Sequence, residues 1–414
     1  MVSGEEKAFS DKGGGGGAER LKKAWKQPLD LVCQVDAAIY GSGGVARYAK
    51  SMIGGLVSYG QSPKLFWVEQ ATQAERKDLF KKELERLIYV PLASKFARTR
   101  RFKWLMLIAE KMEQLRVYSN INSLLGEHKF YWSMCHRLCD VSGPKRIVTI
   151  HDAIAALSDR YHKQDEIKEF SKFLSLTRKL ADLLFVPSEA TKEDLVKRLR
   201  FPQDIIEVLP SPLDPIFLDP PKDLPKPTFK NPYILSVGTL GVRKDVKGLF
   251  EAYQMFRKEV PDKVLLVLVG RTSANLMRLK ELFESSPYGS DVVHIGFVDD
   301  LTLASLYKNA TLLCYPSLAE GFGYPVAEAM ALGVPVVSYK LPSIEWITES
   351  RAAKLVPIGD NNALAKAMLE VAQSRGVSEQ LSRHGRLIAK RFAPRKLAMK
   401  AVKIIRDRFA TSEG

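Results

Sequence analysis

Two glutamates, Glu320 and Glu328, stand one behind the other in the segment EGFGYPVAEAMALGVPVVSY, residues 320–339. The pattern predicts a short helix over 325–332, whose N-terminal backbone N–H groups could hold a diphosphate. Glu328 would lie one turn inside this helix with its side chain leaning back towards Glu320. Carboxylates accept hydrogen bonds from sugar and ribose hydroxyls. Either glutamate alone could simply complement the helix dipole or lie solvated in a loop, but the whole string favours a binding site.

The residues around these glutamates define the turn and the helix ends. Gly321 and Gly323, on either side of Phe322, allow the backbone to approach a ligand closely. Pro325 is typical of the first position of a helix, and Gly333 is typical of its end.

A second candidate site lies in YILSVGTLGVRKDVKGLFEAY, residues 233–253, which predicts a strand, a glycine turn and a helix. Arg243 and Lys244 stand at the helix entry, where a pyrophosphate would meet both their side chains and backbone amides. Arginine offers a planar fork and lysine a point charge. In a chain this basic, a solvated basic turn is the alternative.

Two turns in the first half of the chain also follow predicted strands. Gly43 and Gly44, in YGSGGVARY, suit a strand-to-helix turn near a phosphate or an ordinary tight turn. His151 and Asp152, in TIHDAIAALSDRYH, end a strand, where α/β proteins place their polar ligands. Alternatively, Asp152 caps a helix and His151 is a packing residue.

The elements that would position these residues are apolar runs alternating with helical stretches. Continuous apolar runs indicate strands covered on both faces, and their alternation with helices indicates βαβ units and parallel sheets. Ten such runs are predicted as strands: 31–36, 64–68, 146–150, 183–188, 205–210, 233–238, 264–270, 292–297, 312–317 and 334–339. The prediction is an α/β protein of two Rossmann-like domains whose parallel sheets face a central cleft.

The domain boundaries follow composition. Residues 1–28, with five consecutive glycines, are predicted to be a flexible tail, and residues 29–212 the first domain. The proline-rich stretch 213–230 is predicted to be a linker without regular helix or central strand. Residues 231–390 are predicted to form the second domain, and a basic helix in 391–414 is predicted to pack back on the first domain.

Charge and cysteine content bound the class of protein. The 414 residues carry a formal net charge of +16, which attracts phosphate-rich partners. There is no apolar run of roughly 20 residues and no signal-peptide pattern, and the four cysteines suit free thiols in the cytoplasm. No metal site is predicted, because the cluster WSMCHRLCD lacks a second group of ligands. KFARTRRFKWLML, residues 95–107, suits either an anionic membrane surface or a solvated helix face.

The segment 320–339 resembles the Glu-x7-Glu signature of glycosyltransferase family 4, whose members have the two-domain GT-B fold. The resemblance implies that Glu320 touches the donor sugar and that Glu328 holds the ribose hydroxyls. It also places the backbone of Gly321, Phe322 and Gly323 against the sugar and the phosphates.

Four other segments resemble the same family. The resemblance implies that Lys244 and Arg243 neutralise the departing diphosphate; many members carry an arginine where this chain has Thr239, and Arg243 is the candidate for its role. By the same resemblance the backbone of Gly43 and Gly44 faces the donor, and His151 lies beside the donor sugar. In HIGFVDDLTLASLY, residues 294–307, the backbone near Phe297 and Val298 would hold the base, and Asp299 and Asp300 would cap the next helix.

The resemblance implies a retaining hexosyltransferase that requires neither a divalent metal nor a cofactor. Its donor would be a GDP-sugar or UDP-sugar, with GDP-mannose preferred, and its acceptor a glycan or lipid-linked sugar. Peripheral attachment to the inner face of the membrane would accompany a lipid-linked acceptor, and no specific nucleic acid is expected. The alternatives are a basic protein that binds nucleic acid or an anionic surface, a non-catalytic binding protein, and another GT-B enzyme such as a sugar-nucleotide epimerase or a phosphorylase.

Overall fold

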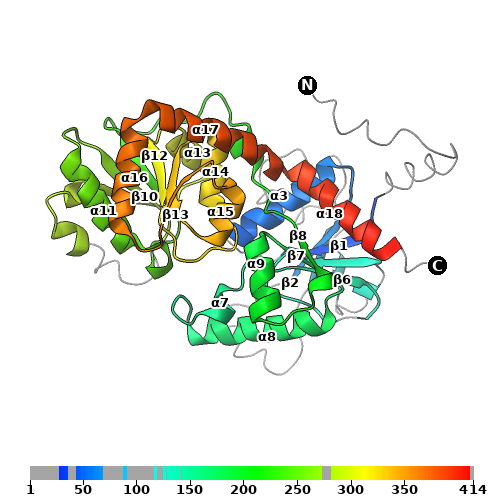
Figure 1. Cartoon of the computed structure of the whole chain (residues 1–414). Coiled ribbons are helices and arrows are strands. Elements are labelled where there is room, and N and C mark those ends of the chain that lie inside the picture. The colour runs from blue at the N-terminus through cyan, green and yellow to red at the C-terminus, as the bar shows by residue number, and fades with distance from the viewer. Residues whose placement is uncertain are drawn as a thin grey trace, which may run out of the picture.

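A computed structural model describes residues 28–35, 43–68, 87–90, 116–118, 125–126, 128–140, 142–272 and 281–410. The predicted tail, apart from its last residue, and the basic segment 95–107 lie outside these ranges. The described chain forms two α/β halves that lie side by side (Figure 1).

The N-terminal half contains an eight-stranded sheet in the order β4-β3-β2-β1-β5-β6-β7-β8. Strand β3 pairs antiparallel with both β2 and β4, and the other neighbours pair in parallel. Of its strands, β3, β4 and β5 were not expected from the sequence. The strands are β1 (Leu31–Gln34), β2 (Lys64–Val68), β3 (Leu87–Val90), β4 (Arg116–Tyr118), β5 (Phe130–Ser133), β6 (Lys145–Thr149), β7 (Leu183–Val186) and β8 (Ile206–Val208).

The C-terminal half contains a six-stranded, all-parallel sheet in the order β11-β10-β9-β12-β13-β14. Five strands were expected and β14 was not. The strands are β9 (Tyr233–Val237), β10 (Leu265–Val269), β11 (Val292–Gly296), β12 (Leu312–Tyr315), β13 (Val336–Tyr339) and β14 (Lys354–Val356). Strands β10, β12 and β13 are buried along their whole length, as continuous apolar runs require.

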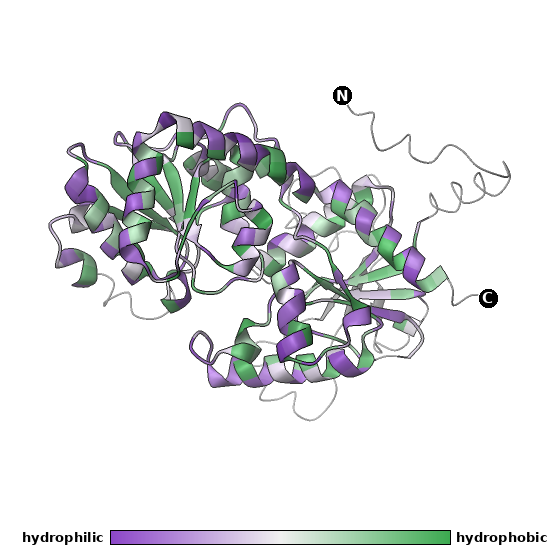
Figure 2. Ribbon diagram, viewed as in Figure 1, coloured by the Kyte–Doolittle hydropathy of each residue, from purple (hydrophilic) through white to green (hydrophobic). Residues whose placement is uncertain are grey.

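Helices lie against the sheets, with hydrophobic faces inward and polar faces outward (Figure 2). The N-terminal half has α3 (Gly44–Ser58), α7 (Ile154–Leu157), α8 (Gln164–Leu180) and α9 (Glu189–Glu193). The C-terminal half has α11 (Val246–Glu259), α13 (Asp300–Lys308), α14 (Tyr324–Leu332), α15 (Pro342–Thr348), α16 (Asn361–Gln373) and α17 (Arg375–Ala389).

The proline-rich stretch between the halves contains a short helix, α10 (Pro215–Leu218), so the prediction that it lacks any regular helix was wrong. Pro215 occupies the start of the helix, where its missing N–H is no loss. Asp214 caps the helix by accepting a hydrogen bond of 2.9 Å from the N–H of Ile216. Phe217 anchors the helix in the hydrophobic core of the C-terminal half.

The last helix, α18 (Pro394–Phe409), crosses from the C-terminal half to the N-terminal half, where it packs against α3 (Figure 1). Its first residue, Pro394, lies so close to Gly55 of α3 that a Cβ on Gly55 would be 2.4 Å from the carbonyl oxygen of Pro394. Leu397, Val402 and Ile405 complete the core of the N-terminal half. The final helix therefore ties the two halves together.

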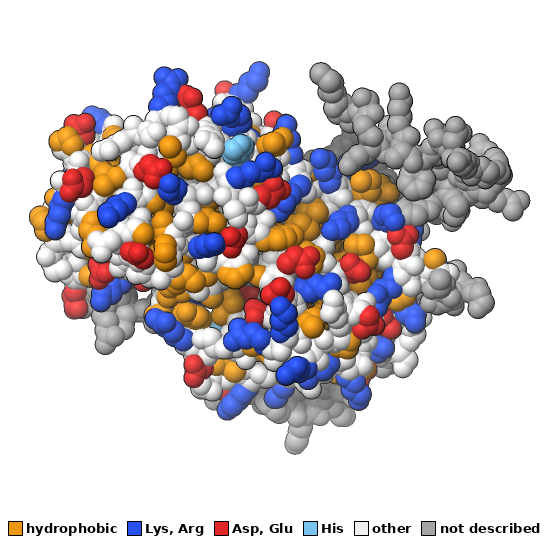
Figure 3. Space-filling model, viewed as in Figure 1, with side chains coloured by type: hydrophobic (Ala, Val, Ile, Leu, Met, Phe, Trp, Pro, Cys, Tyr) orange, Lys and Arg blue, Asp and Glu red, His pale blue; other side chains and the backbone are white. Residues whose placement is uncertain are grey.

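The surface in view mixes lysine and arginine with acidic side chains over both halves (Figure 3). Within the described part of the chain, no helix is long and apolar enough to cross a membrane. The same residues contain no group of three or more His, Cys, Asp or Glu side chains placed to hold a metal ion.

Candidate functional site

A cavity of about 350 Å³ lies between the two halves. Residues at the carboxyl ends of β9, β10 and β12 line it together with the first turn of α3, as expected of ligand sites in α/β sheets. All twelve candidate residues lie on its wall: Gly43, Gly44, His151, Arg243, Lys244, Phe297, Val298, Glu320, Gly321, Phe322, Gly323 and Glu328. The structure thus brings together residues from five separate segments, and their binding of a donor stays a prediction.

Helix α14 begins at Tyr324, one residue before the predicted start, and ends at Leu332 as predicted. Gly323 caps its N-terminus with a φ of 95° and Gly333 its C-terminus with a φ of 72°, so both use a left-handed backbone that favours glycine. At Gly323 a Cβ would also come within 2.4 Å of Ile344 Cδ1. The glycine spacing therefore fixes both ends of the helix that carries Glu328.

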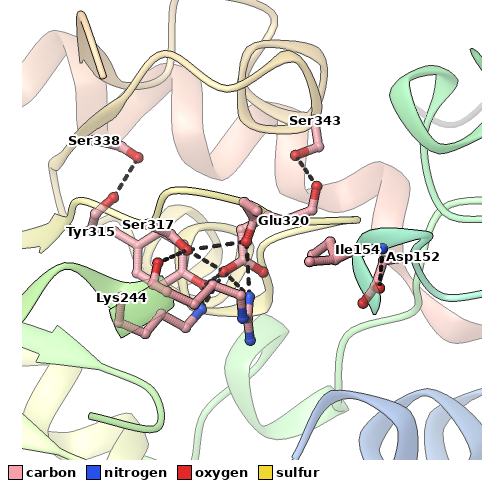
Figure 4. A network of polar contacts seen from close by, with 10 residues as sticks. Asp152, Ile154, Lys244, Tyr315, Ser317, Glu320, Ser338 and Ser343 are labelled. Carbon is pink, nitrogen blue, oxygen red and sulfur yellow. Dashed lines mark hydrogen bonds and ion pairs between the residues drawn. The ribbon is translucent and has the colours of Figure 1, made fainter. Parts of the chain in front are cut away.

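One oxygen of Glu320, Oε1, accepts hydrogen bonds from the side chains around it (Figure 4). Arg243 Nη1 donates at 2.7 Å, Tyr315 Oη at 2.8 Å and Ser317 Oγ at 2.6 Å, and Lys244 Nζ also bonds to it. All four side chains belong to the C-terminal half. Glu320 is thus held in one orientation before any ligand arrives.

The charges in this cluster shift one another's protonation. Burial would raise the pKa of Glu320, but Lys244 and Arg243 outweigh it and bring the pKa to about 2. Burial lowers the pKa of Lys244 to about 8, against the attraction of Glu320. At neutral pH the site therefore holds two cations against one carboxylate, a net positive charge beside the N-terminus of α14.

Glu328 has a different set of partners. Its side chain is 1% exposed, and its Oε2 accepts a 2.9 Å hydrogen bond from the hydroxyl of Tyr307 in α13. Its Oε1 is bonded to Nη1 of Arg47, which comes from α3 in the other half. Burial raises the pKa of Glu328 above its ordinary value, while Arg47 and Tyr307 oppose the rise.

Arg47 was not among the predicted site residues, although it lines the cavity. It stands three residues after Gly44 within YGSGGVARY, in the first turn of a helix whose N-terminus was expected to face the donor. This position was a signal that an arginine could reach the cleft. Its partner Glu328 lies 281 residues away in the sequence, so the pair itself left no local pattern.

The N-terminal half also holds the backbone of Gly321 directly. Ser188 Oγ donates a 2.7 Å hydrogen bond to the carbonyl oxygen of Gly321. A Cβ on Gly321 would lie 2.1 Å from the carbonyl oxygen of His151 and 2.7 Å from Asp152 Cβ, so only glycine allows this approach. On the same side of the cavity, Gly44 lies against the ring of Tyr324, where a Cβ would be 3.3 Å from Cδ2.

His151 is buried at the end of β6, and its Nε2 lies 3.1 Å from the carbonyl oxygen of Met134. A carbonyl can only accept, so Nε2 carries the proton and donates it there. Burial, with His136 nearby, lowers the pKa of His151 to about 3, and the ring is neutral at physiological pH. Asp152 accepts a 3.0 Å hydrogen bond from the N–H of Ile154, the first residue of α7. The N-cap of this helix is Ala153, without a side-chain cap, so the prediction that Asp152 is the cap was wrong.

Phe297 and Val298 lie at another part of the cavity wall, with Arg271 beside them. The ring of Phe297 is 61% exposed and stands 5.4 Å from the guanidinium of Arg271. Asp299 accepts a 2.8 Å hydrogen bond from the N–H of Thr302, which confirms it as the cap of α13. Asp300 does not cap the helix; it pairs with Arg47 Nη2 at 2.9 Å.

Two family models match the chain in sequence. Residues 42–216 match the model described as Glycosyltransferase Family 4, and residues 221–387 match Glycosyl transferases group 1. O-antigen chain mannosyltransferase B of Escherichia coli is 28% identical over 255 residues, which cover 60% of this chain and 67% of that protein. The serotype-specific mannosyltransferase WbdA of E. coli is 28% identical over 216 residues, but these span only 26% of its length.

Solved structures share the architecture. Sucrose-phosphate synthase from Thermosynechococcus elongatus superposes with a TM-score of 0.66 at 18% identity, over 93% of this chain and all of that one. HepE of Anabaena, in complex with UDP-glucose, gives 0.64 at 15% identity, over 91% and 99%. The fold and the cleft therefore define a GT-B protein. The chain belongs to the group 1 glycosyltransferases of family 4, and it is a hexosyltransferase.

Proposed function

We propose that this protein transfers a hexose, with mannose preferred, from a nucleotide diphosphate sugar to an acceptor hydroxyl and retains the anomeric configuration. The observation that carries the proposal is the cluster of Glu320, Lys244 and Arg243 in the cavity beside the N-terminus of α14. The site combines a fixed carboxylate for sugar hydroxyls with two cations for phosphates. These are the groups that a sugar-diphosphate donor requires.

The rate advantage of this site comes from charge placement. As the bond between the sugar and the diphosphate breaks, negative charge grows on the departing phosphate. Lys244, Arg243 and the backbone N–H groups that open α14 supply positive charge, fixed in position before the reaction begins. Such preorganised electrostatic stabilisation contributes several kcal/mol to catalysis, and removing a single donor typically costs about 10²–10³-fold in rate. The proposal therefore requires neither a divalent metal nor a cofactor.

The bond changes follow a front-face substitution. The bond from the anomeric carbon to the diphosphate oxygen breaks, and the acceptor oxygen bonds to that carbon on the same face. The acceptor proton passes to the departing phosphate oxygen, so the nucleoside diphosphate leaves with that proton and no covalent intermediate forms on the protein. Neutral His151 and the backbone of Gly321 are proposed to position the sugar, and their place on the cavity wall supports this.

The donor is proposed to be a GDP-sugar, with a UDP-sugar as the alternative. The mannosyltransferase relatives support mannose. The HepE neighbours are complexes with UDP or UDP-glucose, which supports the uridine alternative. The acceptor is proposed to be a glycan or lipid-linked sugar. The names of two relatives support this: O-antigen chain mannosyltransferase B and the serotype-specific mannosyltransferase WbdA.

We also propose that the basic sequence 95–107 attaches the protein to anionic membranes. It carries five cations and no acid, interleaved with aromatic residues. The protein should sediment with vesicles rich in phosphatidylserine at low salt and remain in solution with neutral vesicles. Equal behaviour with both kinds of vesicle would contradict the attachment without touching the proposed reaction.

The test of the proposed function begins with thermal unfolding in the presence of GDP, UDP, ADP and dTDP. A nucleotide at 100 times its dissociation constant should stabilise the protein by about 2.7 kcal/mol. The matching mannose or glucose donor is then incubated with a short mannoside acceptor, and the anomeric configuration of the product is read by NMR. No stabilisation by any nucleotide would refute the donor site, and an inverted product would refute retention.

A further inference from the structure

Arg47 reaches from one half of the protein into the other. It lies in the first turn of α3, and its guanidinium contacts three elements beyond the cleft. One nitrogen bonds to Glu328 of α14, another bonds to Asp300 of α13 at 2.9 Å, and the group stands 5.3 Å from the ring of Phe217 in α10. Arginine is suited to such a site because its planar fork binds two carboxylates at once.

The two carboxylates are not equivalent partners. The side chain of Asp300 is 50% exposed, whereas that of Glu328 is 1% exposed and lines the cavity. Within the described part of the chain, Arg47 is the one cation bonded to Glu328. A buried carboxylate without a cation tends to take up a proton.

The protonation of Glu328 depends on every group that faces it. Arg47 comes from α3, Tyr307 and Asp300 from α13, and Tyr324 from its own helix α14, while Tyr315 at the end of β12 lies within electrostatic range. Burial raises the pKa of Glu328, Asp300 adds to the rise, and Arg47 and the Tyr307 hydroxyl oppose it. Burial also disfavours the charge on Arg47, but Glu328 and Asp300 outweigh it and raise the pKa of Arg47.

We propose that Arg47 is a positioning residue of the donor site, which holds the carboxylate of Glu328 ready for the donor's ribose hydroxyls and so couples donor binding to contact between the two halves. The inference rests on the proposed function, because it takes Glu328 as the ribose partner. Each carboxylate oxygen accepts more than one hydrogen bond, so ribose hydroxyls can bind while Arg47 and Tyr307 stay in place. If the halves separated, Glu328 would lose its ion pair with Arg47. The carboxylate would then take up a proton more easily, and the ribose hydroxyls would lose a charged acceptor.

The experiment compares GDP with 2′,3′-dideoxyguanosine diphosphate, which lacks the two ribose hydroxyls. Calorimetry measures both dissociation constants for the wild type, Arg47→Met and Arg47→Lys. Arg47→Met keeps the length of the side chain but removes its charge and donors. We expect the wild type to prefer GDP by about tenfold or more, as hydrogen bonds to a charged group allow. At pH 6 we expect the preference for GDP to be less than about threefold in Arg47→Met and intermediate in Arg47→Lys, which keeps the charge but loses the fork.

A matched control removes another arginine that pairs with a buried carboxylate. Arg257 of α11 pairs with Asp291 at 3.6 Å and lies outside the cavity. Arg257→Met should keep the wild-type preference for GDP, even if its melting temperature falls. Circular dichroism confirms that each variant is folded before its affinities are compared.

A pH series separates positioning from general loosening of the structure. In Arg47→Met the affinity for GDP should fall as the pH is lowered from about 8 to about 6 and Glu328 takes up a proton, by no more in total than the preference for GDP that the ribose hydroxyls give the wild type. The wild type should change less over the same range. A wild-type preference for GDP over the dideoxy nucleotide that survives in Arg47→Met at pH 6 would overturn the role of Arg47 alone. If the wild type bound none of the four nucleoside diphosphates, the proposed function itself would fail.

Discussion

Glu320 and Glu328 lie on the wall of the same cavity but in different environments. Glu320 is surrounded by Arg243, Lys244, Tyr315 and Ser317, all from the C-terminal half. Glu328 has Tyr307 from its own half and Arg47 from the other. Accordingly, the pKa of the first falls to about 2, while the pKa of the second is raised.

This difference shows which part of the site is built by one half of the protein and which part needs both halves. All the side chains that bond to Glu320 come from the C-terminal half, and the N-terminal half touches this cluster only through the backbone of Gly321 and the charge of Asp152. Glu328 acquires its cation only when α3 lies against α14. A protein that must admit a donor, close on it and release a product can place its fixed electrostatics on one side and its closure-dependent contact across the cleft.

The largest expected effect is the loss of kcat when Lys244, one of the two cations beside the departing phosphate, is replaced. Lys244→Met should lower kcat by about 10²–10³-fold, because one of two fixed positive charges is lost where negative charge develops. Glu320 keeps Arg243, Tyr315 and Ser317, so the melting temperature should change little in comparison. Single-turnover rates with a saturating donor measure the effect.

The control for this variant is a lysine on the neighbouring helix. Lys247 of α11 is 74% exposed, pairs with Glu251 at 3.7 Å and lies outside the cavity. Lys247→Met should leave kcat within about twofold of the wild type, since exposed pairs of this kind contribute little. A loss in Lys247→Met as large as in Lys244→Met would show that net charge rather than placement matters.

The second expected effect concerns the pH profile. Because burial lowers the pKa of Lys244 to about 8, kcat/KM, which reports the free enzyme, should decline above that pH. Each further pH unit should cost up to about tenfold as the ammonium loses its proton. Lys244→Arg should move this alkaline limb upward, since a guanidinium stays charged. An unchanged limb in Lys244→Arg would assign it to another group.

The sequence predicted much of the fold from local patterns. All ten expected strands are present, and the glycines at 323 and 333 set the ends of α14 within one residue. Strand β14, with three residues, is too short to show a period, and β3 and β4 form antiparallel pairs that the parallel pattern did not anticipate. Strand β5 was missed although its sequence FYWS is rich in aromatic residues, which favour strands.

The candidate site could be predicted where its residues belong to one short, continuous sequence motif. The loop with Glu320 and the turn with Arg243 and Lys244 each carry a local signal, and the structure brings them together on one cavity wall. The pairings that decide the protonation of Glu328 carry none, because Arg47 lies 281 residues and Tyr307 21 residues away in the sequence. Pairings across a cleft are set by tertiary packing, which a single sequence does not encode in its spacing.

The smallest expected effect comes from two matched tyrosines, each of which donates a hydrogen bond to one of the glutamates. Tyr315 and Tyr307 are both fully buried. Tyr315→Phe leaves Glu320 with three donors, so the free energy of unfolding should fall by about 1 kcal/mol. Tyr307→Phe leaves one oxygen of buried Glu328 without its donor, and the loss should be about 1–3 kcal/mol near pH 8.

The pH dependence of these two losses distinguishes the environments. The folded-state pKa of Glu328 is already raised, and removal of the Tyr307 hydroxyl raises it further. A carboxyl group with a raised folded-state pKa favours the folded state at low pH, and this contribution disappears as the pH rises through that pKa. The loss in Tyr307→Phe should therefore shrink between pH 8 and pH 5, as Glu328 takes up a proton in the variant. Glu320, with a pKa of about 2, stays ionised over this range, and Lys244 is charged below its pKa of about 8, so the loss in Tyr315→Phe should be constant from pH 7 down to pH 5. Urea unfolding at both pH values measures the two differences, and a constant loss in Tyr307→Phe would mean that the two glutamates share one electrostatic environment after all.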